Sequence, residues 1–188
     1  MSKVIIAEKP SVAASIANIV GAIIRKDGYF EGGGYIVSWC FGHLVGQSPP
    51  EAYGEVYNCP PYAQDLTKLP LIPEIWQYEI IQSKPQKGES KAEADKRKQS
   101  NDGTKRQFNT VKNLLHNANE VICATDAGRE GELIFRNVCH LAGFRKPFKR
   151  LWISSLEEVA IREGLSKLRN GSDFDNLHAS GLCRAKAD

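Results

Sequence analysis

Two short apolar runs in this sequence stop abruptly at polar residues and are followed by helical patterns. The first run covers residues 4–7 and the second covers residues 121–124. Behind each run, apolar residues recur three and four positions apart, which is typical of one face of an α-helix. These positions are Val12, Ile16, Ile19 and Val20 after the first run, and Leu133, Ile134, Val138 and Leu141 after the second. The pattern predicts two strand–helix units, with one helix over about 11–20 and the other ending near Gly143.

Further periodic segments continue the same alternation. Residues 108–115 have helical spacing and lead into the second strand, and residues 151–154 predict a third strand that is followed by another helix. Residues 30–39 predict a hairpin, because the glycines at 32–34 separate two extended runs, whereas a phosphate-binding loop would open a helix. Together these segments predict an α/β fold with a compact, mostly parallel sheet and helices on both faces.

An acidic side chain stands directly after each of the two strand-like runs. Glu8 follows the first run and Asp126 follows the second, with two further acids close behind Asp126. In open α/β sheets, ligands bind beyond the carboxyl ends of the strands, and neighbouring parallel strands bring those ends to one edge. Carboxylate oxygens are hard ligands that suit Mg²⁺. The sequence therefore predicts a magnesium site that Glu8 and Asp126 share.

Two motifs give the chain a resemblance to a known family. They are Ala7-Glu8-Lys9-Pro10-Ser11 and Ala124-Thr125-Asp126-Ala127-Gly128-Arg129-Glu130-Gly131-Glu132, and segments 38–44, 69–73, 150–156 and 183–188 follow the family in the same order. Over nearly its whole length the sequence resembles the Toprim domain of type IA DNA topoisomerases, the topoisomerase III branch in particular. The resemblance implies a Toprim (Rossmann-like) fold and a part in the Mg²⁺-dependent breakage, passage and religation of single DNA strands.

The resemblance also implies roles for individual residues. Glu8 and Lys9 take the catalytic positions, Glu8 as an acid/base group and Lys9 beside the scissile phosphate. The implied metal ligands are Glu8, Asp126 and Glu130, and the implied DNA-binding residues are Lys9, Arg129, Arg184 and Lys186. Gly128 stands where the family motif more commonly has a second acid. We therefore expect one weakly held Mg²⁺ ion in place of two.

The same comparison suggests how the chain is divided. We expect a Toprim domain over 1–155, in which 83–107 is a basic hydrophilic loop or linker, and the truncated start of a helical DNA-binding domain over 156–188. The nucleophilic tyrosine of the family lies after Toprim, so no tyrosine of this chain is expected to fill that role. We expect the chain alone to bind Mg²⁺ without cleaving or relaxing DNA.

Composition and charge narrow the class of protein. With 188 residues the chain can bury one sizeable core, and its formal net charge is only +3. Residues 83–107 hold eight basic and four acidic side chains, a local surplus of positive charge that suits either a solvated segment or binding to phosphates.

The cysteines and the apolar runs exclude other classes of protein. Five cysteines without CxxC spacing argue against a disulfide framework or a zinc site, and Cys123 and Cys139 are interpreted as core residues. No apolar run approaches the roughly 18 residues of a membrane span, so we expect a cytoplasmic protein.

The sequence is compatible with several further interpretations. Toprim folds also occur in primases and nucleases, and the acids could belong to a nucleic-acid-binding module without catalysis. The expected partners are single-stranded or negatively supercoiled DNA and, as a candidate, a helicase.

Some individual residues have structural interpretations. Glu132 is interpreted as a complement to the helix dipole. His43 is interpreted as structural, because no Cys or second His stands at ligand spacing. In the proline-rich stretch 49–73, aromatic side chains such as Tyr53, Tyr57 and Tyr62 could stack on bases or attach the loop to the domain.

Overall fold

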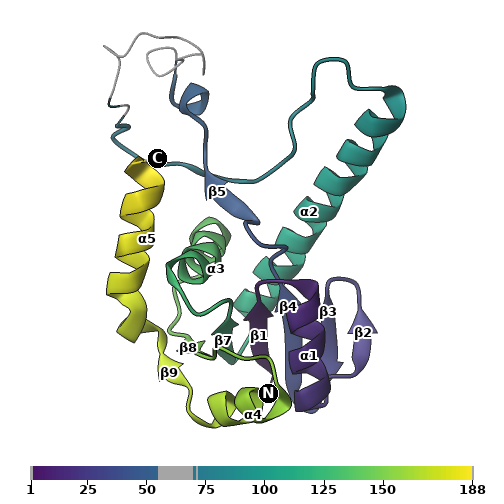
Figure 1. The fold of residues 1–188 in the computed structure, drawn as a ribbon, viewed down its shortest axis with the longest axis vertical. Coiled ribbons are helices and arrows are strands. Elements are labelled where there is room, and N and C mark those ends of the chain that lie inside the picture. The colour runs from purple at the N-terminus through teal and green to yellow at the C-terminus, as the bar shows by residue number, and fades with distance from the viewer. Residues whose placement is uncertain (1, 55–69, 71, 188) are drawn as a thin grey trace.

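A computed structural model describes residues 2–54, 70 and 72–187 of the chain. Within this part, seven strands form one sheet that lies between helices (Figure 1). The order across the sheet is β2-β3-β4-β1-β7-β8-β9. The strands are β1 (Lys3–Ala7), β2 (Ile24–Lys26), β3 (Tyr29–Gly32), β4 (Tyr35–Trp39), β7 (Glu120–Ala124), β8 (Lys149–Arg150) and β9 (Arg169–Asn170).

The centre of this sheet is parallel and its edges are antiparallel. Strands β4, β1, β7 and β8 run in the same direction, whereas β2, β3 and β9 pair antiparallel with their neighbours. Residues 4–7 of β1 and 121–124 of β7 are all buried, because helices cover both faces of the parallel centre. This burial explains why the two apolar runs do not alternate with polar residues, and the predicted mostly parallel α/β fold is confirmed.

Two pairs of helices cover the sheet, one pair on each face. They are α1 (Pro10–Val20) with α4 (Glu158–Ser166), and α2 (Lys91–Asn117) with α3 (Arg129–Ala142). Ile5 of β1 shares one buried core with Ile16 of α1 and Ile161 of α4. Its neighbour Ile6 points to the opposite face and shares the other core with Phe135 of α3. The predicted helices on both faces are confirmed, including the end of α3 at Gly143.

The predicted hairpin at residues 30–39 is also confirmed. Strands β3 and β4 pair antiparallel up to Gly32 and Tyr35, with Gly33 and Gly34 in the connecting turn. Both turn glycines have left-handed backbones, at φ +57° and φ +81°. A side chain at Gly33 would also collide with the carbonyl oxygen of Val20. The glycines therefore serve a tight turn against α1, as the sequence predicted.

The strand that the sequence predicted at 151–154 lies earlier in the chain. It was expected at 151–154, but β8 covers only Lys149–Arg150, and the Leu151 amide continues the ladder by donating to the Cys123 carbonyl at 2.9 Å. Trp152 has already left the sheet and stacks on the Phe174 ring. The apolar run reads as a strand, but its side chains are used to fill the space beneath α4 and the C-terminal segment.

The expected loop or linker at 83–107 is wrong for most of its length, because α2 begins at Lys91. The Ser90 side chain accepts a hydrogen bond from the Glu93 amide, and the Glu93 carboxylate accepts one from the Ser90 amide, which forms a capping box. Lys, Ala, Glu, Gln and Arg dominate the residues that follow, and all favour a helix. Hydrophilic composition was mistaken for irregular structure, although only residues up to Ser90 form a loop.

The C-terminal residues pack on the same body. Strand β9 extends the sheet, and the 3₁₀ turn η4 (Gly171–Phe174) leads into α5 (Asp175–Ala187), which lies beside α3 (Figure 1). A side chain at Gly181 would press on the Arg129 carbonyl oxygen, so α5 approaches the start of α3 closely. Helix α4 covers one face of the sheet and β9 extends it, so residues 158–170 pack with the sheet, and the division of the chain near residue 155 stays a proposal.

A small second sheet and a proline-rich segment complete the described chain. Strand β5 (Val45–Gln47) pairs antiparallel with β6 (Tyr78–Ile80), and η1 (Pro50–Tyr53) follows β5. The Tyr53 hydroxyl contacts the backbone of Gln77, which favours attachment of this segment to the domain over base stacking. Tyr57 and Tyr62 lie outside the described residues. No helix in the described ranges combines the length and the apolar character needed to cross a membrane.

Candidate functional site at the carboxyl edge of the sheet

Two acidic side chains meet where the central strands end. Strands β1 and β7 are adjacent and in register, with Ala7 opposite Ala124, so the residues that follow leave the sheet at one edge. The Asp126 amide donates a hydrogen bond to the Glu8 carboxylate at 3.2 Å. Glu8 is buried and Asp126 is exposed, which gives the pair one fixed and one accessible carboxylate. The predicted meeting of Glu8 and Asp126 at this edge is confirmed.

Lys9 places a positive charge between the two carboxylates. Its Nζ lies 3.5 Å from Glu8 Oε1 and 3.6 Å from Asp126 Oδ2. The negative charge of Asp126, followed by that of Glu8, raises the pKa of Lys9, so its ammonium group stays protonated. Two carboxylates that already share a cation are the donor type that a hydrated Mg²⁺ ion takes, since this ion keeps several waters and needs few protein ligands. The donor set therefore fits one divalent ion.

Glu130 does not join the two strand-end acids, in contrast to the expected three-ligand set. Helix α3 begins at Arg129 and carries Glu130 toward His43, whose Nε2 lies 2.5 Å from the Glu130 carboxylate. Across residues 2–54, 70 and 72–187, no three His, Cys, Asp or Glu side chains come close enough to hold a metal ion. The sequence could place Glu130 in the first turn of a helix, but it could not give the direction of its side chain.

The loop between β4 and β5 brings His43 to this position. Phe41 has φ +55° and is the one described residue besides glycine with a positive φ, a conformation that costs on the order of 1–3 kcal/mol. The Gly42 amide donates to the Glu8 carbonyl oxygen at 2.9 Å and so fastens the loop to the strand end. The contact of His43 with Glu130 links the loop to α3, and the structural role of His43 stays a prediction.

The expected DNA-binding residues are distributed around this edge. Arg184 of α5 lines a cleft of about 640 Å³ together with His43 and Glu130. The Lys186 ammonium lies over the Trp76 ring, 5.1 Å from its centroid. Arg129 is exposed and forms no ion pair with any described residue, so the alternative in which it pairs with a ligating carboxylate is not seen. Lys9 is thus the one of the four that the structure joins to Glu8 and Asp126.

Comparison with known proteins assigns the family. A family model described as the Toprim domain matches residues 3–156. The chain belongs to the Toprim domain family. It is 41% identical over 191 residues to DNA topoisomerase 3 of Bacillus subtilis (strain 168), covering 100% of this chain and 23% of that protein. It is 39% identical over 188 residues to DNA topoisomerase 3 of Shouchella clausii (strain KSM-K16), covering 99% of this chain and 22% of that protein.

The Toprim chain thus spans less than a quarter of the length of these relatives. Among solved structures, it aligns with full-length topoisomerase I from Thermotoga maritima in a monoclinic crystal form at a TM-score of 0.48 and 20% sequence identity. The alignment covers 89% of this chain and 21% of that one. A similarity of this size supports no further conclusion, and the family assignment depends on the Toprim match and the relatives.

Beneath the acidic edge, the Toprim sheet holds a buried ion pair that the sequence analysis missed. The Arg150 Nε donates to Glu132 at 3.0 Å, and both side chains are fully buried. The Arg150 guanidinium also donates to the carbonyl oxygens of Thr125 and Asp126, each at 2.7 Å. Arg150 therefore fixes the backbone that presents Asp126. The one signal in the sequence that could have indicated this pair was the position of Arg150 next to an apolar run.

Glu132 lies in the first turn of α3, as its interpretation as a complement to the helix dipole requires, but it is also a buried partner of Arg150. Its side chain has no solvent exposure, and its second oxygen accepts a hydrogen bond from Arg136 at 2.9 Å. Arg136 in turn contacts Asp175 at the start of α5. The network connects the end of β7 with α3, β8 and α5. In the sequence, Glu132 has the position of an exposed acid in the first turn of a helix. Its burial depends on Arg150, 18 residues later, and the sequence does not show that pairing.

The turn after Asp126 depends on a close approach by Gly131. A side chain at Gly131 would overlap the Asp126 carbonyl oxygen, well inside van der Waals contact. The Thr125 hydroxyl donates to the Gly131 carbonyl at 2.7 Å, which closes the turn from the other side. Gly128 differs, because its extended backbone suits any residue and open space surrounds it. The position of the absent second acid could therefore accept one.

The buried thiols of this Toprim domain take no part in the site. Cys40, Cys123 and Cys139 are buried, as predicted for the last two. Burial raises the pKa of all three thiols, so they stay protonated and are poor metal ligands. The carboxylates of Glu8 and Asp126 can meet a cation at this edge, and Lys9 can meet a phosphate.

Proposed function

We propose that this Toprim domain works within a type IA DNA topoisomerase of the topoisomerase III kind. The observation that carries the proposal is the cluster of Glu8, Lys9 and Asp126 at the ends of neighbouring parallel strands. The names of the relatives at about 40% identity point the same way. The reaction would change DNA topology by breaking one strand, passing another through the gap and rejoining the first.

We infer a separate task for each member of the cluster. Asp126, with Glu8, would hold one hydrated Mg²⁺ ion, whose positive charge would offset the phosphate charge and help to position the cleaved end. The Lys9 ammonium would contact the scissile phosphate directly, since it is protonated and half-exposed. Glu8 is buried beside it and would exchange a proton with the 3′-hydroxyl that leaves the phosphorus and later returns.

The remaining predicted site residues keep weaker proposals. Glu130 would serve as a ligand only after it parts from His43. Arg129 and Arg184 would contact the DNA backbone near the cleft beside α3. Lys186 would do so at the end of α5, where it now covers Trp76.

The proposal includes parts of the system that lie beyond this domain. The nucleophilic tyrosine would come from a following domain, with residues from about 156 leading into it. The substrate would be single-stranded or negatively supercoiled DNA, with a helicase as a candidate partner, in the cytoplasm. An acidic edge that meets phosphates through Lys9 and a metal is consistent with such a division of labour.

Plasmid assays test the proposed reaction. The intact protein that contains this chain should relax negatively supercoiled DNA in the presence of Mg²⁺, and Asp126→Asn should abolish the relaxation. Glu158→Gln removes an exposed acid from α4, away from both the acidic edge and α2, and should leave relaxation unchanged. Incorporation of labelled nucleotides would identify a primase, and release of DNA fragments would identify a nuclease. Full relaxation by Asp126→Asn would contradict the assigned role of the acidic edge.

A further inference from the structure

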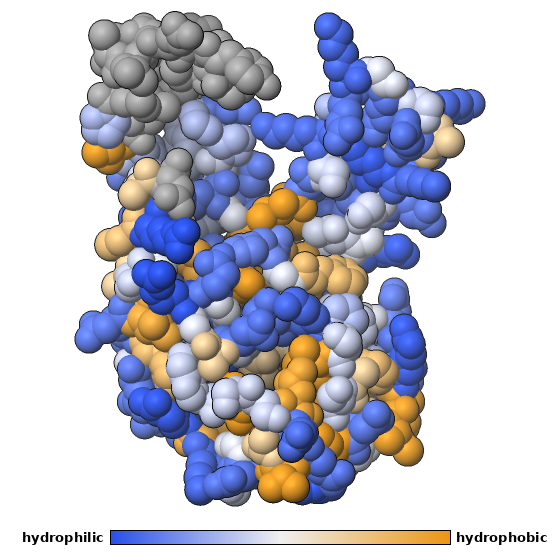
Figure 2. All heavy atoms as spheres, in the orientation of Figure 1, coloured by the Kyte–Doolittle hydropathy of each residue, from blue (hydrophilic) through white to orange (hydrophobic). Residues whose placement is uncertain are grey.

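Helix α2 projects from the body of the molecule, and only its second half is packed. The buried residues of the helix, including Phe108 and Leu115, all follow residue 106. Residues 91–106 include no fully buried residue and no apolar side chain larger than alanine. Figure 1 shows this part extending beyond the sheet, and Figure 2 shows the corresponding surface as almost entirely hydrophilic. This half of α2 contributes nothing to the core.

Four lysines form a row along this helix, which we call the α2 lysine row. They are Lys91, Lys98, Lys105 and Lys112, spaced seven residues apart. Seven residues advance an α-helix by two turns with a drift of about 20°, so the four side chains stay on one side. At a rise of 1.5 Å per residue they stand about 10.5 Å apart and cover about 31 Å. All four are exposed, and none pairs with an acid among the described residues.

The charge surplus of the chain is concentrated in this helix. Lys91–Asn117 holds seven basic and three acidic side chains, a net charge of +4, whereas the whole chain has +3. The acid at residue 93 is engaged in the capping box with Ser90. Asp95 and Asp102 lie beside the row without forming an ion pair in the described structure. The row therefore presents net positive charge to solvent.

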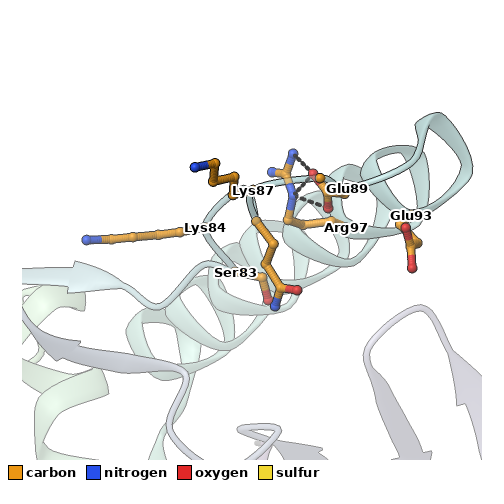
Figure 3. Close-up of a pocket in the computed structure, with 8 residues that line it drawn as sticks. Ser83, Lys84, Lys87, Glu89, Glu93 and Arg97 are labelled. Carbon is orange, nitrogen blue, oxygen red and sulfur yellow. Dashed lines mark hydrogen bonds and ion pairs between the residues drawn. The ribbon is translucent and has the colours of Figure 1, made fainter.

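The loop before α2 braces the projecting half. The Arg97 guanidinium binds the Glu89 carboxylate with contacts of 2.9 and 3.1 Å, and both side chains are largely buried by the loop. The Asn101 side chain exchanges two hydrogen bonds with the Ser83 backbone, at 2.9 and 3.1 Å. Figure 3 shows the Glu89–Arg97 pair between helix and loop, with Lys84 extending away from it. A merely solvated helix end would gain little from such bracing.

The chemistry of the row selects its partner. Residues 91–106 include no aromatic side chain on which an unpaired base could stack, which argues against single-stranded nucleic acid. They also include no apolar face that could enter a lipid surface. A DNA duplex presents about one phosphate charge per 1.7 Å along a stiff axis, which suits a rigid row of lysines.

We propose that the α2 lysine row binds the phosphate backbone of double-stranded DNA, at a place separate from the Glu8–Asp126 edge. The contact would be independent of sequence, because lysines that meet phosphates carry no information about the bases. It goes beyond the proposed strand-breaking reaction and does not depend on it. The duplex would be held by α2 while the acidic edge stays free to meet another part of the DNA.

The test compares two double variants with the same change in charge. Lys98→Gln with Lys105→Gln removes the middle of the row, and Lys96→Gln with Arg106→Gln removes two exposed charges from other sides of the same helix. Binding of the chain to a short labelled duplex is measured by fluorescence anisotropy between about 50 and 200 mM salt. The row variant should bind roughly tenfold more weakly or worse at about 100 mM salt, and the slope of log K against log salt should shrink by about 2. The control should change affinity less than about threefold.

Three outcomes would overturn the proposal. Equal weakening by both variants would show a response to total charge without a defined row. Unchanged duplex binding by the row variant would exclude the contact. If the row variant lost affinity for poly-glutamate as much as for the duplex, the row would be a general polyanion-binding surface that could equally bind an acidic protein. Helix content measured by circular dichroism should be the same in all variants, because every substituted side chain is exposed. Metal binding at Asp126 is a separate measurement, so either proposal can fail alone.

Discussion

The acidic edge and the projecting half of α2 both gather charge, but they do so in opposite ways. At the edge, Glu8, Asp126 and the buried Glu132–Arg150 pair come from four separate elements and fix one another through short contacts. On α2, the charges are local in sequence, exposed and free of ion pairs along the lysine row. Ligands for a small ion must be held in a fixed geometry, which here depends on contacts between several elements of the tertiary fold. A positive electrostatic field for a long polyanion requires only one helix that the neighbouring loop holds in place.

Breaking the buried pair should have the largest effect. Arg150→Leu would leave the Glu132 carboxylate buried without its main partner, which should cost about 3–5 kcal/mol of unfolding free energy. The matched control is Arg162→Leu, which breaks an exposed ion pair with Glu158 and should change stability by less than about 1 kcal/mol. Urea denaturation measures both values. Similar losses of unfolding free energy in the two variants would contradict the conclusion that the buried ion pair stabilises the fold more than an exposed one.

Replacing glycine by alanine should have opposite effects on stability at the acidic edge and in the projecting half of α2. Gly131→Ala would drive a methyl group into the Asp126 carbonyl and should cost about 1–3 kcal/mol. Gly103→Ala lies in α2 with open space around it and should stabilise the protein by about 0.5–1 kcal/mol, since alanine favours a helix. Thermal unfolding gives both shifts. A loss for Gly103→Ala would mean that α2 is packed where the structure leaves it open.

The smallest expected effect is local to the start of α2 and depends on pH. Hydrogen bonds from the Ser90 side chain and then its backbone lower the pKa of Glu93. A lowered pKa in the folded state means that the capping box stabilises the helix in full above about pH 4.5 and is lost as pH falls through the lowered value. The protection factors of the amides at residues 91–94, which correct exchange rates for their intrinsic pH dependence, should fall over that range. Ser90→Ala should exchange faster at neutral pH and respond less to acid.

Much of this fold could be predicted from the sequence because its signals are local. The apolar runs at 4–7 and 121–124 and the helical spacing behind them identified β1, β7, α1 and α3 with nearly correct limits. The glycine turn between β3 and β4 was equally clear. Helix α2 was not, because a hydrophilic segment without apolar periodicity was taken for a loop, although Ser90 and Glu93 stand at capping-box spacing.

The candidate site could be predicted only in part, for a physical reason. Neighbouring parallel strands end at one edge of a sheet, so the meeting of Glu8 and Asp126 after β1 and β7 was predictable. The direction of Glu130 depends on the loop at Phe41–His43, and the burial of Glu132 depends on Arg150 from another strand. Neither pairing leaves a periodic trace in the sequence. Side-chain partners from distant elements are what the sequence alone could not provide.

The most direct test of the acidic edge is a Mg²⁺ titration of the chain followed by backbone amide NMR. We expect shifts centred on Glu8, Lys9 and Asp126, their loss in Asp126→Asn, and no change in the control Glu158→Gln. Gly128→Asp should tighten binding, because its backbone and surroundings accept a second acid near Asp126. Shifts that survive in Asp126→Asn, or that centre on α2 in the wild type, would contradict a metal site at this edge.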